Sequence, residues 1–228
     1  MIGLIGAMEA ETAAIRQEMT DKTEETVSGI LFTQGVWHGK ETVIATCGIG
    51  KVFAALCAQT MIIKYAPDCI INCGVAGGLN PDCCLLDVVL AKDAVQHDMD
   101  TSPIGDPKGL ISGINKIELP ADQELTAALK TAAEELGLPV RIGRIASGDQ
   151  FIADEAKKEA IRTEFAADCC EMEGAAIGQV CYVNRVPFAV LRTLSDGAGS
   201  DAKMDYPTFA AKAAAQSIDI LRAFVLAK

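Results

Sequence analysis

The sequence predicts an α/β fold in which helices cover a central sheet, and three observations indicate it. Short apolar runs alternate with segments of helical periodicity along the 228 residues. Half of the residues are hydrophobic and only 5% are aromatic, so the core is expected to consist mainly of aliphatic side chains. Several apolar runs end in glycine or acidic clusters, as in α/β proteins that bind ligands at the carboxyl ends of their strands.

The N-terminal part is expected to begin with a strand and a helix. Ile2–Gly6 is apolar throughout and predicts a buried strand, and Glu9–Met19 predicts a helix with two carboxylates in its first turn. Gly29–Val36 and Glu41–Cys47 predict a hairpin that turns at a His-Gly-Lys tripeptide. A Gly-Ile-Gly turn then leads into a predicted helix over Lys51–Tyr65, which ends near a proline.

The middle of the chain continues this alternation. Cys69–Cys73 predicts a buried strand that ends in a glycine-rich turn over residues 74–78, where the backbone can approach a ligand closely. Leu86–Val95 predicts the next strand. Residues 101–113 are rich in Gly, Pro and Ser and predict a long loop, a kind of segment that often carries function. A helix over Asp122–Leu136 is expected after it.

The C-terminal part repeats the strand and helix pattern. Val140–Ala146 predicts a strand that ends in the sequence SGDQF, and Glu173–Tyr182 predicts a helix. Pro187–Leu194 predicts a further strand, and Pro207–Ala227 predicts a long Ala-rich helix. Because no repeat, low-complexity tract or linker interrupts the pattern, we expect one domain over residues 1–228.

The charge balance argues against one class of function. The chain carries 20 basic and 31 acidic side chains, a formal net charge of −11. A protein that binds nucleic-acid phosphates needs clustered Lys and Arg, so we expect no nucleic-acid partner. The apolar N-terminus has no basic residue and is closed by Glu9 and Glu11, which come too early for a secretory signal. No apolar run is long enough to span a membrane, and we expect a cytoplasmic protein without a membrane partner.

The nine cysteines are expected to be reduced packing residues. No CxxC pair is present, and two pairs are sequence neighbours, which is a poor geometry for ordinary disulfides. Most of the others stand in apolar runs, where cysteine behaves as a small hydrophobe. With only two histidines the usual spacing of a zinc site is missing, so we expect no metal.

Two phosphate-binding fingerprints are absent from the glycine turns. The segment Gly48-Ile49-Gly50 lacks the third glycine of a dinucleotide-binding GxGxxG motif. The Gly50-Lys51 pair is followed by Val52 instead of Ser or Thr, and the upstream glycine of a P-loop is missing. The turns therefore predict close contact with a ligand other than a nucleotide phosphate.

Four carboxylates stand near predicted strand ends: Glu11, Glu171, Glu173 and Asp196. Each has an ordinary structural explanation, such as a helix first-turn charge for Glu11 or a turn cap for Asp196. Glu171 and Glu173 would share one face of a strand if this segment is extended. Together, around one pocket, such a set suits cleavage of a glycosidic bond, which needs an acid for the leaving group and a base for a water.

Four separated motifs carry a resemblance to a known family. They are IGAMEAE at residues 5–11, SGDQFI at 147–152, EME at 171–173 and Ser195-Asp196. In order and spacing they resemble the bacterial 5′-methylthioadenosine/S-adenosylhomocysteine nucleosidases of the purine nucleoside phosphorylase superfamily, from residue 1 to about residue 228. The resemblance implies a three-layer nucleoside phosphorylase-like fold, with a mixed central β-sheet flanked by helices. It implies no cofactor.

The resemblance also implies site residues. Asp196 would protonate N7 of adenine, and Glu11 would hold and deprotonate the attacking water. Glu173 would bind the ribose hydroxyls, Phe151 would stack on adenine, and Arg192 would steady the carboxylates or the water. The substrate-binding residues implied in full are Met8, Ile49, Val75, Ala76, Gly77, Phe151, Ile152, Glu171, Met172, Glu173, Arg192, Ser195, Ala198 and Tyr206.

The substrates implied are 5′-methylthioadenosine and S-adenosylhomocysteine, with 5′-deoxyadenosine as a further candidate, and the products are adenine and the matching ribose derivative. Such hydrolysis belongs to methionine salvage and the recycling of S-adenosylmethionine by-products. A homodimer is implied, also suggested by the loop over residues 99–113, and in it residues 99–106 reach the partner's alkylthio pocket. Two departures from the family bear on the pocket: Val75 stands where a Ser is frequent, and residues 99–106 are unusual.

Two alternative functions remain open at the level of sequence. A purine nucleoside phosphorylase would need cationic groups for phosphate by the first strand, where this chain has Met8, Glu9 and Glu11. A non-catalytic nucleoside-binding protein would have no need of both Glu11 and Asp196. We therefore expect an N-glycosyl hydrolase.

Overall fold

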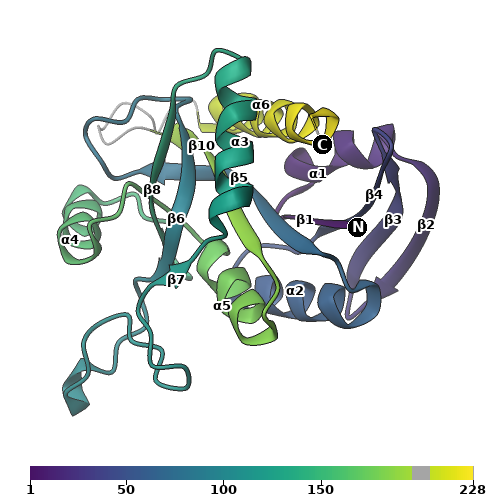
Figure 1. Ribbon diagram of the computed structural model, residues 1–228. Helices are drawn as coiled ribbons and strands as arrows, with labels where there is room; N and C mark the ends of the chain where they lie inside the picture. Colours follow the sequence, from purple (N-terminus) through teal and green to yellow (C-terminus); the bar gives the residue numbers. More distant parts are fainter. Residues whose placement is uncertain (197–205, 228) are drawn as a thin grey trace.

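The computed structural model of the chain describes residues 1–196 and 206–227, with the side chains of residues 206 and 207 excepted. It contains one mixed sheet of ten strands flanked by helices (Figure 1). The strands are β1 (Ile2–Gly6), β2 (Thr20–Val27), β3 (Ile30–Trp37), β4 (Lys40–Thr46), β5 (Cys69–Gly78), β6 (Val88–Gln96), β7 (Leu119–Pro120), β8 (Val140–Ser147), β9 (Cys169–Glu171) and β10 (Phe188–Asp196). The helices are α1 (Glu9–Glu18), α2 (Lys51–Tyr65), α3 (Gln123–Glu135), α4 (Glu155–Phe165), α5 (Gly174–Asn184) and α6 (Tyr206–Leu226), with a 3₁₀ turn, η1, at Ser102–Ile104.

The strand order is β10-β6-β8-β9-β5-β1-β4-β3-β2, with β7 beside β6. Strand β1 pairs in parallel with β4 and β5, whereas β3 pairs antiparallel with β2 and β4. Strand β10 pairs with both β5 and β6, so β10, β6, β8, β9 and β5 form a closed circuit of hydrogen-bonded strands. The sheet is therefore mixed, as predicted.

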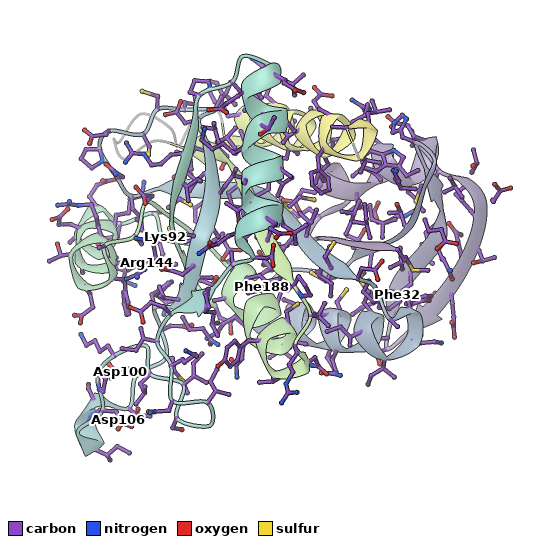
Figure 2. All side chains as sticks on the ribbon, in the orientation of Figure 1. Phe32, Lys92, Asp100, Asp106, Arg144 and Phe188 are labelled. Atoms are coloured by element: carbon purple, nitrogen blue, oxygen red, sulfur yellow. The ribbon has the colours of Figure 1, made fainter. Side chains whose placement is uncertain are left out.

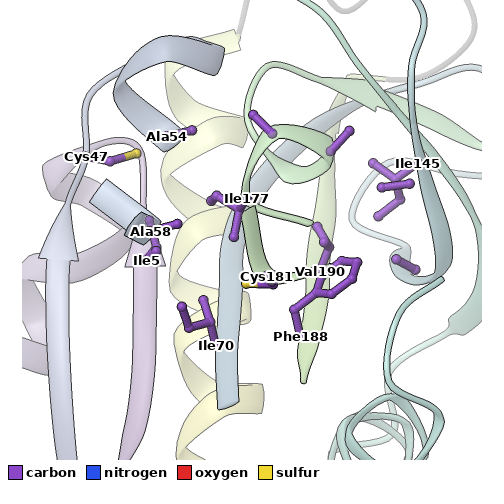
Figure 3. Packing of buried hydrophobic residues seen from close by; sticks show 14 of the residues in the cluster. Ile5, Cys47, Ala54, Ala58, Ile70, Ile145, Ile177, Cys181, Phe188 and Val190 are labelled. Atoms are coloured by element: carbon purple, nitrogen blue, oxygen red, sulfur yellow. The ribbon is translucent and has the colours of Figure 1, made fainter. Parts of the chain in front are cut away.

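Helices cover both faces of the sheet because its central strands are apolar on both faces. Ile70 packs in a cluster with α2 and α5, and its neighbour Ile71 packs in a second cluster with α1, α3 and α6. The same alternation holds for Ile5 and Leu4 in β1, since successive strand residues point to opposite faces. Figure 3 shows Ile5 and Ile70 between the strands and the two helices of the first cluster. The result is the predicted three-layer α/β arrangement.

Apart from the two-residue strand β7 and the 3₁₀ turn η1, three elements lie where the sequence predicts none. Strand β2 is polar and exposed along most of its length, and it is the last strand of the sheet, an edge position where charged side chains are frequent. Helix α4 buries only Lys158, Ile161 and Phe165, so its apolar periodicity is weak. Strand β9 has three residues, too few for a pattern.

The glycine-rich segment after Cys73 is a continuation of strand β5 and not a turn. Val75, Ala76 and Gly77 follow β10 in parallel register, opposite Thr193, Leu194 and Asp196. The prediction of a turn was wrong because these glycines were interpreted as residues at which the chain turns. In β5 they instead leave space for neighbouring side chains.

The loop between β6 and β7 extends away from the sheet, as Figures 1 and 2 show for the segment that carries Asp100 and Asp106. Internal hydrogen bonds organise it: Asp100 accepts from the backbone N–H of Ser102, and Asp106 accepts from the hydroxyl of Thr101 at 2.8 Å. Ile104 at its tip is 82% exposed. Within residues 1–196 and 206–227, no helix has the length and apolar character needed to cross a membrane.

Candidate active site

A pocket opens at the carboxyl ends of β1, β5, β9 and β10, and most of the predicted site residues line it. Those that do are Met8, Glu11, Ile49, Val75, Ala76, Gly77, Phe151, Ile152, Glu171, Met172, Glu173, Ser195 and Asp196. The parallel pairing of β1 with β5 and of β5 with β10 brings their carboxyl ends together. Residues separated by more than 180 positions in the sequence therefore share one cavity.

Helix α1 positions Glu11 through its first turn. The carboxylate accepts hydrogen bonds from the backbone N–H groups of Ala7 at 2.7 Å, Met8 at 2.9 Å and Val75 at 3.2 Å. Burial raises the pKa of Glu11, and the Arg192 guanidinium and these N–H groups act against that rise. The side chain is thus fixed in place, can hold a negative charge and has a raised affinity for a proton.

Gly74 gives the Glu11 carboxylate its space. A Cβ atom at position 74 would collide with Oε1 of Glu11. Gly77 has a similar relation to Asp196, whose Oδ1 would lie 3.1 Å from an added Cβ. The glycines of β5 therefore make room for two carboxylates, one on each side of the pocket.

Glu171 belongs to a buried ion pair beneath the pocket. Its carboxylate pairs with the guanidinium of Arg192, which also bonds Asn72, and it accepts from the hydroxyl of Ser147. Burial alone would raise the pKa of Glu171, but Arg192 and the hydrogen bonds hold it below its ordinary value. Arg192 is 1% exposed and does not line the pocket, so it acts on the site through its ion pair with Glu171 and through its charge near Glu11.

Glu173 has a different environment from Glu171, although the two are close in sequence. Glu171 ends β9, whereas Glu173 precedes α5 outside any strand, so the two do not share a strand face as the sequence analysis suggested. Oε1 of Glu173 accepts from the backbone N–H of Gly50 at 2.8 Å. Burial, together with the nearby charge of Glu171, raises the pKa of Glu173 to about 7.

Asp196 ends β10 on the opposite side of the pocket. Its Oδ2 lies 3.4 Å from Nζ of Lys158, and its Oδ1 lies 3.5 Å from Oγ of Ser195. Burial raises the pKa of Asp196, and the ammonium of Lys158 opposes this rise. A carboxyl group that tends to keep a proton is suited to donate one.

The mouth of the pocket is apolar and open. Phe151 is 64% exposed and Ile49 is 57% exposed, while Ile152 is buried. Large exposed side chains beside a pocket provide a surface on which a flat base or an alkyl group can pack.

Two predicted site residues cannot be placed in the pocket, and three residues that were not predicted line it. Ala198 lies outside the described residues, as does the side chain of Tyr206. Ala7, Gln150 and Cys170 also line the pocket. The first two lie inside motifs that the sequence analysis used, and Cys170 directly precedes the EME motif, so adjacency could have indicated all three.

The described pocket-lining residues include four carboxylates and neither Lys nor Arg. Within the part of the chain that the structure describes, no group of three or more His, Cys, Asp or Glu side chains is arranged to hold a metal ion. The pocket therefore suits an uncharged polar ligand with an apolar end.

Comparisons with known proteins agree with this geometry. The family model of the phosphorylase superfamily matches residues 1–226. A 5′-methylthioadenosine/S-adenosylhomocysteine nucleosidase of Shewanella loihica is 40% identical over 214 residues, which cover 93% of each chain.

Two solved structures from Helicobacter pylori are similar along nearly the whole chain. One is a mutant nucleosidase of the same name with 5′-methylthioadenosine in its active site, at a TM-score of 0.93 and 36% identity, covering 98% of this chain and 97% of that one. The other is a futalosine hydrolase, at a TM-score of 0.92 and 37% identity, covering 98% and 96%. The chain belongs to the phosphorylase superfamily and, within it, to the 5′-methylthioadenosine/S-adenosylhomocysteine nucleosidases.

Proposed function

We propose that this protein hydrolyses the N-glycosidic bond of 5′-methylthioadenosine and S-adenosylhomocysteine, releasing adenine and the corresponding thioribose. The observation that carries the proposal is the placement of Glu11 and Asp196 in one pocket with different surroundings. The names of relatives at about 40% identity support the same activity.

Asp196 is the proposed acid. It donates a proton to N7 of adenine while the bond between C1′ and N9 breaks, so the base leaves as neutral adenine. The raised pKa of Asp196, which follows from its burial, favours the protonated form that this step requires. The ribose acquires oxocarbenium character as the bond breaks, as in other glycosidic cleavages.

Glu11 is the proposed base. A water held by its carboxylate attacks C1′ and transfers a proton to Glu11, which completes the hydrolysis. Three backbone N–H groups fix the carboxylate, so little reorganisation is needed when the water reacts. Glu173 would bind the ribose hydroxyls, Phe151 would stack on adenine, and Met8 and Ile49 would contact the 5′ substituent.

Hydrolysis is favoured over phosphorolysis by the charges in the pocket. Glu11, Glu171, Glu173 and Asp196 would repel phosphate, and none of the described residues that line the pocket is cationic. The nearby Arg192 is buried and paired with Glu171. A phosphorylase needs a cationic cradle for its anion, and the described part of this pocket has none.

Adenine release from 5′-methylthioadenosine, measured with and without phosphate, tests the activity. We expect release without phosphate. Release only in its presence would establish a phosphorylase, and binding without release would establish a nucleoside-binding protein. Parallel kcat/KM values for S-adenosylhomocysteine, 5′-deoxyadenosine and futalosine would rank the substrates.

Two variants test the assigned roles. Asp196→Asn should lose about 10² to 10⁴-fold in kcat, the range expected when a general acid is removed, while circular dichroism shows that the variant is folded at the assay temperature. Glu11→Gln should lose kcat by a similar factor while the KM for 5′-methylthioadenosine stays within a few-fold. Near-native kcat in either variant would contradict the role of that residue.

We also propose that the protein forms a homodimer through α2 and α5. Val52, Phe53, Leu56 and Ile63 of α2 are exposed, as are Tyr182 and Val183 of α5. The two helices adjoin, since Nδ2 of Asn184 donates to Oε1 of Gln59 at 2.9 Å. Apolar side chains gathered on one face are typical of a protein interface, and residues 99–106 would then reach the partner's pocket.

We also propose that the protein is located in the cytoplasm, a reducing compartment. All nine cysteines are free thiols, and eight of them are buried. Free thiols in this number are typical of proteins in reducing compartments.

A further inference from the structure

Lys158 is a buried charged residue that the proposed mechanism does not use. It is 6% exposed, whereas its neighbours Lys157 and Glu159 on α4 are exposed. Its Nζ lies 3.4 Å from Oδ2 of Asp196 and 3.6 Å from Oε1 of Glu155. Because removing an ammonium from water is costly, a lysine in this position needs a specific carboxylate partner.

Helix α4 brings this side chain to Asp196 from behind the pocket wall, since Lys158 itself does not line the pocket. Asp154 caps the helix by accepting from the backbone N–H of Lys157 at 2.9 Å. Ile161 and Phe165 lie three and seven positions after Lys158, on the same helix face, and both are buried in a cluster that includes Cys170 of the pocket wall. The apolar contacts of α4 therefore fix the position from which Lys158 reaches Asp196.

The two oxygens of Asp196 have separate surroundings. Oδ2 lies 3.4 Å from Nζ of Lys158, while Oδ1 lies 3.5 Å from Oγ of Ser195, and both Ser195 and Gly77 beside the carboxylate line the pocket. We propose that Lys158 is a positioning residue for the reaction, which holds Oδ2 of Asp196 and leaves Oδ1 to face the purine. This inference rests on the proposed function, because it assigns Asp196 the role of acid.

The charged groups around Asp196 affect its pKa, so the role of Lys158 can be measured in the pH profile of the reaction. On α4, Lys158 lowers the pKa of Asp196 and Glu155 raises it, and on β9 the thiol of Cys170 lies nearby. The alkaline limb of the kcat/KM profile reports loss of the proton from the free acid. Removing Lys158 should therefore move this limb to higher pH, and removing Glu155 should move it to lower pH.

The experiment compares pH profiles of adenine release from 5′-methylthioadenosine. Lys158→Met should shift the alkaline limb upward by about one pH unit, as expected for loss of an opposite charge within 4–6 Å. Lys158→Arg, which keeps the charge, should restore the wild-type limb. Glu155→Gln should shift the limb downward by a few tenths of a unit. Lys157→Met is the matched control and should leave the limb in place.

The pH profile of Lys158→Met tests the proposed role of Lys158 directly. A folded Lys158→Met variant whose alkaline limb coincides with that of the wild type would overturn the proposal. If that variant does not fold, Lys158→Gln decides by the same measurement: an upward shift supports the role of Lys158, and an unmoved limb overturns it. Wild-type protein that releases no adenine at any pH would instead refute the proposed function, a result distinct from active variants with coinciding profiles.

Discussion

Oε1 of Glu173 accepts a hydrogen bond of 2.8 Å from the backbone N–H of Gly50, the residue that precedes helix α2. This bond connects the loop after β4 to the start of α5, across 123 positions of sequence. A helix N-terminus favours a negative charge. Burial and the charge of Glu171 nevertheless raise the pKa of Glu173 to about 7, so its ionisation falls within the physiological range.

The first prediction concerns the pH dependence of ribose binding. If ionised Glu173 binds the ribose hydroxyls, kcat/KM for 5′-methylthioadenosine should fall as the pH drops below about 7, because the carboxylate gains a proton. Glu173→Gln should lower kcat/KM roughly 10- to 100-fold, from about 1.5–3 kcal/mol for hydrogen bonds to a charged group. It should also flatten the acidic limb near pH 7. A variant that retains this limb would assign it to another group.

The second prediction uses the glycines of β5. Gly74→Ala places a methyl group against Oε1 of Glu11, so the carboxylate must leave its N–H donors. We expect kcat to fall by about 10²-fold or more, as for the misplacement of a catalytic group. Gly77→Ala, whose methyl group would lie 3.1 Å from Oδ1 of Asp196, should have a smaller effect.

Gly113→Ala is the control for this series, since an added methyl group there meets nothing within 4 Å. Its kcat should equal that of the wild type. Equal activity of the Gly74 and Gly113 variants would show that the space beside Glu11 has no role in the reaction.

These contacts explain how far the sequence could predict the site. Glu11 and Asp196 follow apolar strands, and the carboxyl ends of parallel strands meet at one sheet edge, so their convergence followed from local patterns. The role of Gly74 could not be read in this way, because a glycine that leaves space for a distant side chain looks like a glycine in a turn. Lys158 gave no signal, since it stands among charged residues on a helix with only two buried apolar side chains.

The same distinction between local and long-range features holds for the fold. Strands such as β1 and β5, with apolar side chains on both faces, have an unmistakable sequence pattern. The edge strand β2 has almost none, because its stability depends on hydrogen bonds to β3 and not on burial. Long-range pairing, such as that of β10 with both β5 and β6, has no local signature at all.

The third prediction concerns assembly. Phe53→Asp places a charge in the exposed apolar face of α2, where Phe53 is 50% exposed. By sedimentation velocity, the wild type should be a dimer and this variant should shift towards monomer by about 10-fold or more in Kd, because a charge is desolvated at the interface. Leu226→Asp, at the end of α6, is the control and should remain a dimer. A monomeric wild type at micromolar concentration would contradict the proposed interface.

The fourth prediction concerns stability. Glu18, at the end of α1, accepts hydrogen bonds from Arg222 of α6 at 2.7 Å and from the Trp37 indole at 3.0 Å. These bonds, led by that of Arg222, lower the pKa of Glu18 from 4.5 to about 2. A depressed pKa adds stability above the unfolded-state value, and this stability is lost as the pH falls from about 4.5 towards 2.

Glu18→Gln should therefore lower the free energy of unfolding at pH 7 by about 1 kcal/mol, a modest value because the side chain is 33% exposed and water screens the pair. The difference from the wild type should shrink steadily in urea titrations carried out between pH 5 and pH 2.5. Glu41→Gln on β4, whose side chain forms no hydrogen bond or ion pair with the described residues, should match the wild type throughout. A difference for Glu18→Gln that stays constant with pH would mean that the amide disturbs packing, because only an ionic contribution disappears when the carboxylate is protonated.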